Sequence, residues 1–261
     1  MAPIVEARSL NKQFGAVVAA RDISIAIDEG TITGLIGTNG AGKTTFVNML
    51  TGYLKPDTGH IRFRGADITQ LPPRAIIRRG ISRSFQIPQL FNSLPVRENL
   101  AVAIAARAAL GLNGLRTADR AALDAQANDM MERFGLKDFA ASAAGTLPEG
   151  IRKLLDMAVA MVASPTVLLL DEPTSGVASE EKFSVMDRVM TANRGAGVTM
   201  LFVEHDMAIV RRYASRVIAF FAGTILADGQ PEVVLKDARV RELIIGDSQA
   251  PSSGTVEVPD A

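Results

Sequence analysis

The sequence predicts an α/β protein in which buried strands alternate with helices and turns. Two apolar runs, at 31–36 and 167–170, have the length and composition of strands that are buried on both faces. Residues 94–144 are rich in Ala, Leu, Met and charged side chains, which favours several helices. With 261 residues, of which 48% are hydrophobic, the chain can form one large domain or two small ones.

Composition and charge exclude several classes of protein. The 28 basic residues balance 28 acidic ones, whereas a nucleic-acid-binding domain is usually basic, so we expect no nucleic-acid partner. Cysteine is absent, which excludes disulfides and thiolate metal sites. The start of the chain lacks the apolar region of an export signal, and the longest apolar stretches are much shorter than a membrane helix. We therefore expect a soluble chain that acts on a membrane only through partner subunits.

The remaining elements follow from local patterns. Residues 4–36 predict short strands and turns, and a helix is predicted at 44–51. Residues 57–68 alternate like a half-exposed strand, and 217–227 predict a hairpin. The last stretch, 248–261, holds Pro, Ser, Gly and acidic residues with little that can pack, so we expect a disordered tail.

A phosphate-binding pattern, G-x-x-x-x-G-K-[ST], lies between the strand at 31–36 and the helix at 44–51. Glycines bring backbone N–H groups close to phosphate oxygens, and the start of the helix directs its positive dipole end at them. Lys43 adds a full charge for the β- and γ-phosphates, and the Thr44 hydroxyl can ligate Mg²⁺. The candidate nucleotide-binding residues here are Gly37, Thr38, Asn39, Gly40, Ala41, Gly42, Lys43, Thr44 and Thr45.

Two carboxylates follow the buried strand at 167–170. Asp171 lies where it can hold Mg²⁺, and Glu172 points to the other side of the strand, towards the attacking water. A hydrophobic run that ends in Asp-Glu is, by itself, usually a strand edge that meets solvent. Paired with the phosphate-binding loop, it predicts the second half of a nucleotide-hydrolysing site.

Three further segments narrow the class. Gln86 ends the sequence Ser-Arg-Ser-Phe-Gln, residues 173–177 (Pro-Thr-Ser-Gly-Val) follow the carboxylates, and His205 follows an apolar strand at 198–203. Together and in this order they resemble the Q-loop, D-loop and H-loop of ABC transporter ATPases, and the resemblance covers residues 4–246.

The resemblance implies a P-loop ABC ATPase fold. It would combine an N-terminal antiparallel β subdomain, a RecA-like core and an inserted helical subdomain at about 87–163, within an ATPase domain that spans 1–247. The cofactors would be ATP and Mg²⁺, with Thr44, Gln86 and Asp171 around the metal.

The resemblance also implies a role for each remaining site residue. Gln86 would touch Mg²⁺ or the attacking water, Glu172 would polarise that water, and His205 would bind the γ-phosphate. Phe14 falls where the family places an aromatic ring under the adenine, and such stacking tolerates any purine. The alternative for Phe14 is a place in the hydrophobic core.

Four stretches, 14–20, 50–56, 85–100 and 239–246, are similar to the ATPases of branched-chain amino-acid importers. That likeness implies membrane-spanning permease subunits, a second and different ATPase chain and, indirectly, a periplasmic binding protein. The chain would then lie peripherally on the cytoplasmic face of the inner membrane. Importers of this class also handle aromatic acids, urea and other small solutes, so the solute stays open.

One segment departs from the family pattern. The signature, usually Leu-Ser-Gly-Gly-Gln or Leu-Ser-Tyr-Gly-Gln, reads Leu-Pro-Glu-Gly-Ile at 147–151. In the family it opens a helix and binds the γ-phosphate held by the opposite subunit. Pro148 supplies neither a hydroxyl nor an N–H, whereas Gly150 is kept. Arg152 and Lys153 are candidates to compensate in part, and we expect a heterodimer with a chain whose signature is complete.

Two other functions remain as alternatives. A nucleotide-gated regulatory module would bind ATP with little turnover, but the presence of both Glu172 and His205 argues against a pure binder. An ABC ATPase of DNA repair or translation usually carries a long coiled-coil insertion or two ATPase domains, and this sequence has neither.

Overall fold

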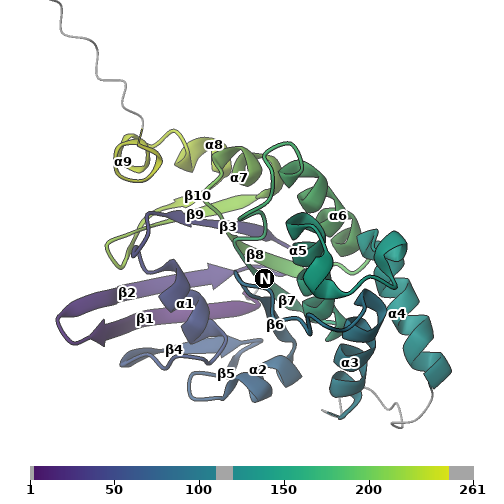
Figure 1. The fold of residues 1–261 in the computed structure, drawn as a ribbon. Helices are drawn as coiled ribbons and strands as arrows, with labels where there is room; N and C mark the ends of the chain where they lie inside the picture. The colour runs from purple at the N-terminus through teal and green to yellow at the C-terminus, as the bar shows by residue number, and fades with distance from the viewer. Residues whose placement is uncertain (1–2, 110–119, 247–261) are drawn as a thin grey trace, which may run out of the picture.

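The computed structural model describes residues 3–109 and 120–246. The tail that we expect at 248–261 lies outside these residues. Within them, the chain forms two β-sheets with helices packed around them (Figure 1). No helix in 3–109 or 120–246 is long and apolar enough to cross a membrane.

The first sheet is antiparallel and confirms the expected N-terminal β subdomain. It has four strands in the order β2-β1-β4-β5. Its first two strands are ten and eleven residues long rather than short, because shifts of register between them let long strands bend without ending. The strands are β1 (Val5–Phe14), β2 (Val17–Ile27), β4 (Thr58–Phe63) and β5 (Ala66–Asp67).

The second sheet has six strands in the order β10-β9-β3-β8-β7-β6. All neighbouring pairs are parallel except β10 and β9, which form the predicted hairpin. Parallel strands share one carboxyl edge, where ligands bind in open α/β sheets. The strands are β3 (Ile32–Gly37), β6 (Ile81–Ser84), β7 (Val167–Asp171), β8 (Thr199–Val203), β9 (Arg216–Phe221) and β10 (Thr224–Gly229).

The helices cover the faces and one side of the sheets. Helices α3, α4 and α5 lie together beside the parallel sheet, within the range expected for a helical subdomain (Figure 1). The helices are α1 (Lys43–Leu50), α2 (Pro73–Arg79), α3 (Val96–Ala109), α4 (Arg120–Phe134), α5 (Glu149–Val162), α6 (Lys182–Arg194), α7 (Met207–Tyr213), α8 (Pro231–Val234) and α9 (Ala238–Val240), with single turns at Lys137–Phe139, Ala144–Thr146 and Arg241–Ile245.

The parallel sheet separates two hydrophobic cores. Adjacent residues of one strand face opposite cores: Leu35 of β3 packs with Phe46 of α1 and the first sheet, whereas Ile36 packs with helices α3 to α6. Burial on both faces explains why the strands at 31–36 and 167–170 read as unbroken apolar runs. The site-bearing edge of the sheet is therefore held from both sides.

Candidate nucleotide-binding site

The phosphate-binding loop joins β3 to α1 through backbone that only glycine fits. Gly37 and Gly42 have φ angles of +152° and +105°. A Cβ atom at Gly37 would lie 2.4 Å from the Phe220 carbonyl oxygen, and one at Gly42 would lie 2.6 Å from that of Ala19. Strands β9 and β2 thus press on the loop from two sides and fix its path.

Lys43 begins α1, and its side chain reaches back into the loop. Its side chain is buried, and its Nζ donates to the Gly37 carbonyl at 2.6 Å and the Thr38 carbonyl at 3.0 Å. Burial lowers the pKa of Lys43, while the charges of Glu172 and Asp171 act to raise it. Both carboxylates therefore lie close enough to the ammonium to interact with it.

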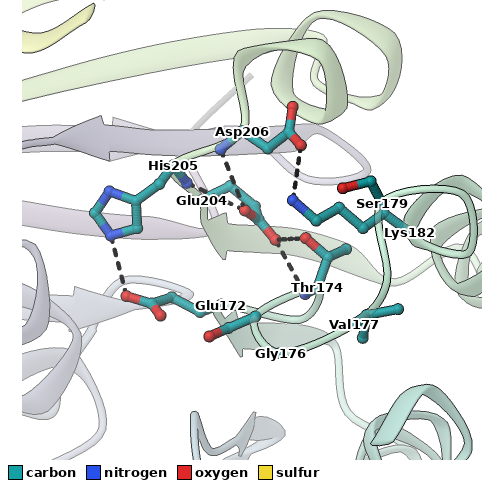
Figure 2. A pocket seen from close by; sticks show the side chains of 10 residues that line it. Glu172, Thr174, Gly176, Val177, Ser179, Lys182, Glu204, His205 and Asp206 are labelled. Atoms are coloured by element: carbon teal, nitrogen blue, oxygen red, sulfur yellow. Dashed lines mark hydrogen bonds and ion pairs between the residues drawn. The ribbon is translucent and has the colours of Figure 1, made fainter.

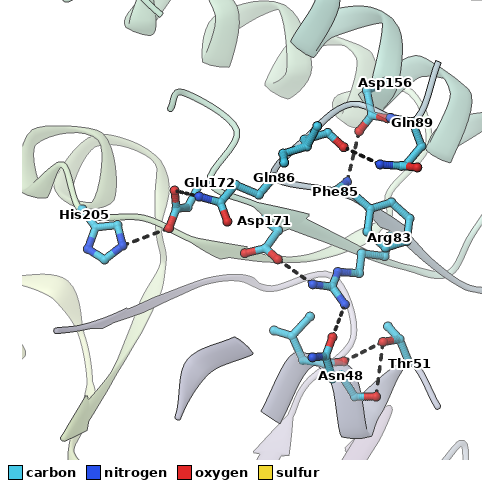
Figure 3. Close-up of polar contacts among 12 residues, drawn as sticks. Asn48, Thr51, Arg83, Phe85, Gln86, Gln89, Asp156, Asp171, Glu172 and His205 are labelled. Carbon is cyan, nitrogen blue, oxygen red and sulfur yellow. Dashed lines mark hydrogen bonds and ion pairs between the residues drawn. The ribbon is translucent and has the colours of Figure 1, made fainter. Parts of the chain in front are cut away.

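Asp171 ends β7 and faces a cation that the sequence did not single out. Arg83 of β6 donates to Asp171 Oδ2 at 2.5 Å and to Asn48 Oδ1 of α1 at 2.6 Å (Figure 3). Only 7% of each charged side chain is exposed, so the pair is a buried one that fixes the carboxylate against β6. Asn48 lies one turn beyond Thr44 on α1, so Arg83 connects that helix to the same carboxylate.

Glu172 is hydrogen-bonded to two other predicted site residues, Gln86 and His205. Its Oε2 accepts from the Gln86 amide at 2.9 Å, and its Oε1 lies 3.0 Å from His205 Nε2 (Figure 3). Glu172 has a φ of +50°, a left-handed conformation that is uncommon outside glycine. The structure thus brings Gln86, Glu172 and His205 together, and Asp171 faces Arg83 instead; their catalytic roles remain predictions.

A pocket of about 240 Å³ opens beside Glu172 and His205, between the D-loop and the start of α7 (Figure 2). Glu204 lines this pocket. Its carboxylate accepts hydrogen bonds from the Thr174 amide at 3.0 Å, the Thr174 hydroxyl at 2.6 Å and the His205 amide at 3.1 Å. Lys182 bonds Asp206 at 3.0 Å on the far side. The buried Glu204 therefore fixes the backbone of both loops.

Phe14 lies at the end of β1 with half of its surface exposed. This contradicts the alternative that it is a core residue. The ring lies beside the Lys12 ammonium, whose Nζ is 5.5 Å from the ring centroid. Phe14 pairs with Val17 of β2, and two residues further along that strand Ala19 lies against Gly42, so the start of β2 connects the end of β1 to the phosphate-binding loop.

The signature-like segment opens α5, as predicted. Pro148 caps the helix without a side-chain hydrogen bond, and its carbonyl accepts from the Ile151 and Arg152 amides at 3.0 Å each. Gly150 is buried against Val185 of α6.

Of the two cations expected to compensate in the signature, Lys153 does not face outward. It is 3% exposed and bonds the Gln86 and Glu172 carbonyls of its own subunit, which contradicts that expectation. Arg152 is partly exposed and lies 3.7 Å from Glu149.

Arg83, Asn48, Asp156 and Glu204 support the site but were not predicted. Each acts on a partner that is distant in the sequence, such as Arg83 on Asp171, 88 positions away. The available signal was a charged residue within an otherwise apolar stretch, as with Asp156 in Leu-Leu-Asp-Met.

A phosphate-binding loop and a carboxylate pair at the carboxyl edge of one parallel sheet define the class of P-loop nucleotide hydrolases. The family described as ABC transporter matches residues 20–175. The high-affinity branched-chain amino acid transport ATP-binding protein BraF of Pseudomonas aeruginosa is 34% identical over 253 residues, covering 94% of this chain and 99% of that protein. LivG of Escherichia coli (strain K12), described in the same words, is 35% identical with the same coverage.

Solved structures agree with the sequence relatives. An ATP-binding cassette of an ABC transporter in its ADP conformation matches with a TM-score of 0.83 and 30% identity, covering 95% of this chain and 100% of that one. The chain belongs to the ABC transporter family. It is an ATPase coupled to transport, and its partners are membrane permease subunits.

Proposed function

We propose that this chain is the ATP-hydrolysing motor of an importer for branched-chain amino acids or related small solutes. The observation that carries the catalytic part is the Glu172 carboxylate, held by Gln86 and His205 at the edge of the sheet that also carries the phosphate-binding loop. The proposed solute rests on the names of the relatives BraF and LivG, which are described as branched-chain amino acid transport proteins.

Nucleotide binding would change the partners of Lys43. Its ammonium now bonds two carbonyls of its own loop, and a bound β- or γ-phosphate would offer a charged acceptor in their place. Phe14 would stack on the adenine, because its ring is exposed at the end of β1, which the start of β2 connects to the loop.

Mg²⁺ fits the oxygen donors that the site offers. Thr44, Asp171 and the Gln86 amide supply a hydroxyl, one carboxylate and a carbonyl, and Mg²⁺ at nucleotide sites is usually held by one or two carboxylates together with phosphates. Arg83 occupies one oxygen of Asp171 and leaves the other available. The metal would neutralise charge on the transferring phosphate.

Glu172 would accept a proton from the attacking water. Its carboxylate is 19% exposed, so water can reach it, and His205 holds one oxygen from the neighbouring loop. His205 is then placed to contact the γ-phosphate with the same ring. Gln86 holds the second oxygen and connects the site to the segment that follows β6.

The permease would dock beside that segment. Ile87, Phe91 and Tyr53 are large apolar side chains with 74%, 55% and 56% of their surface exposed. Tyr53 packs edge-on against Phe85, 5.8 Å between ring centroids, so the exposed Tyr53 ring contacts the residue that precedes Gln86. Exposed apolar side chains that gather in one place mark interaction sites. Docking here would place the chain on the cytoplasmic face of the inner membrane.

The second ATPase would be a different chain. Pro148 offers neither hydroxyl nor N–H at the start of α5, and Lys153 is engaged within its own subunit. A complete signature would therefore have to come from the partner. A periplasmic binding protein would deliver the solute to the permease.

Uptake by cells tests the solute. Cells without this gene should take up labelled leucine slowly, and the wild-type gene should restore uptake whereas Lys43→Ala should not. Excess unlabelled isoleucine should compete. Unchanged leucine uptake in the deletion strain would refute this solute, and loss of urea or aromatic-acid uptake instead would identify the other solute classes.

A further inference from the structure

Lys153 and Asp156 are two buried charged residues on one face of α5. They are three positions apart, as are Gly150 and Lys153, so all three lie along the same side of the helix. Only 3% of Lys153 and 4% of Asp156 is exposed. Burying a charge is costly unless it is paired and hydrogen-bonded, so the contacts of these two side chains require an explanation.

Asp156 bonds the backbone of the segment 85–89. One carboxylate oxygen accepts from the Phe85 amide at 3.1 Å and the other from the Gln89 amide at 3.0 Å (Figure 3). Burial raises the pKa of Asp156, and the two backbone N–H groups oppose that shift. A single carboxylate therefore holds both ends of the segment in which Gln86 lies.

Lys153 bonds the backbone of the two residues whose side chains meet at the hydrolysis site. Its Nζ donates to the Gln86 carbonyl and, at 3.2 Å, to the Glu172 carbonyl. Burial lowers the pKa of Lys153, while nearby carboxylates raise it. The Gln86 Nε2 and Glu172 Oε2 atoms are 2.9 Å apart. Lys153 therefore joins the backbones of the same two residues whose side chains are hydrogen-bonded to each other.

We propose that Lys153 and Asp156 are positioning residues, which hold Gln86 and Glu172 in register and join them to the start of α5. This inference rests on the proposed ATPase role of Glu172. Because Gly150 lies one turn before Lys153, a shift of α5 against the second subunit's nucleotide would carry both site residues with it. The signature-like segment would then act on the nucleotide of its own subunit as well.

Kinetics of the purified chain with its second ATPase subunit test the proposal. Lys153→Met keeps the length of the side chain but removes its charge, and Lys137→Met, an exposed lysine paired with Glu132, is the matched control. We expect kcat to fall about tenfold to a hundredfold, since small misplacement of reacting groups has effects of this size, while KM stays near wild type. In a Gln86→Ala background the further loss should be much smaller, because the Gln86 side chain that Lys153 holds against Glu172 is then already absent.

Losses that simply multiply in the double variant would overturn the proposal, as would a lower melting temperature with unchanged kcat. Asp156→Asn provides a second readout that needs no activity. It replaces one acceptor oxygen by a donor, so amide hydrogen exchange at Phe85 or Gln89 should accelerate relative to Lys137→Met. Unchanged exchange at both amides would refute the contact. A wild-type pair without ATPase activity would instead refute the proposed function, and the exchange result would still decide the positioning role.

Discussion

Glu172 contacts two of the other predicted site residues, and its own backbone is strained. Its left-handed φ of +50° directs the carboxylate between Gln86 and His205, whereas Asp171, one residue earlier, faces Arg83. Left-handed conformations of non-glycine residues cost about 1–3 kcal/mol and persist where the surroundings hold them. Lys153 helps to stabilise this conformation by donating a hydrogen bond to the Glu172 carbonyl.

Glu172→Gln should keep ATP affinity and stall hydrolysis. A general base typically contributes about 10²- to 10⁴-fold in rate, and the amide cannot accept the proton. Sedimentation with ATP and Mg²⁺ should show more dimer than for wild type. Lys43→Ala is the contrasting control, because loss of its charge should weaken nucleotide binding itself. Hydrolysis at the wild-type rate in Glu172→Gln would contradict the assignment.

Phe14→Ala should weaken nucleotide binding by about 1–3 kcal/mol, the range for loss of base stacking. The melting temperature should hardly change, because half of the Phe14 surface is exposed and little packing is lost. Titration of a fluorescent ATP analogue, together with thermal unfolding, separates the two effects. Unaltered affinity would remove Phe14 from the site.

The sequence predicted residues that the structure places at the site, whose catalytic roles stay predictions, and it missed the residues that hold them in position. Gln86, Asp171, Glu172 and His205 stand in motifs whose order is informative. Arg83 and Glu204 are single charged residues whose importance depends on burial and on partners that folding brings near, and neither is visible from local pattern.

At the scale of elements, the phosphate-binding loop depends on close packing between β3 and β9. The Gly37 backbone lies so near the Phe220 carbonyl that no side chain fits between them. The loop is therefore held by the sheet itself as well as by its own turns. Its alignment with the ends of β7 and β8 follows from the parallel register of the three strands.

Gly37→Ala should destabilise the fold and disturb the loop. The added Cβ would lie 2.4 Å from a backbone oxygen, at a φ that side chains rarely adopt, so β9 must shift. We expect a loss of roughly 1–3 kcal/mol or more in the free energy of unfolding, measured by urea denaturation. Gly30→Ala, also at positive φ but with open space around it, should cost about 1–2 kcal/mol at most. Equal losses would show that the contact with β9 is unimportant.

Strands that are buried on both faces could be predicted from the sequence, whereas the short strand β6 could not. The runs at 31–36 and 167–170 carry enough apolar residues to identify β3 and β7. Strand β6 (Ile81–Ser84) has only four residues, two of them serine, and it becomes a strand because β7 lies beside it. Its importance is large, since it carries Arg83 and leads into Gln86.

At the scale of the whole molecule, the chain presents a complete loop and an altered signature. Each ATP of an ABC dimer lies between the loop of one subunit and the signature of the other, as the family resemblance implies. A homodimer would place Pro148 at both nucleotides, and losing one oriented donor costs about 10²–10³ in rate. A mixed dimer would keep one fast site, formed by this chain's loop, Glu172 and the partner's signature.

The most direct test is the ATPase rate of this chain alone and mixed with the second ATPase subunit. The partner should raise the rate strongly, and Glu172→Gln in this chain should remove most of that gain, because the fast site uses this chain's carboxylate. A homodimer already as fast as the mixture, or a gain that survives Glu172→Gln, would contradict the asymmetric motor.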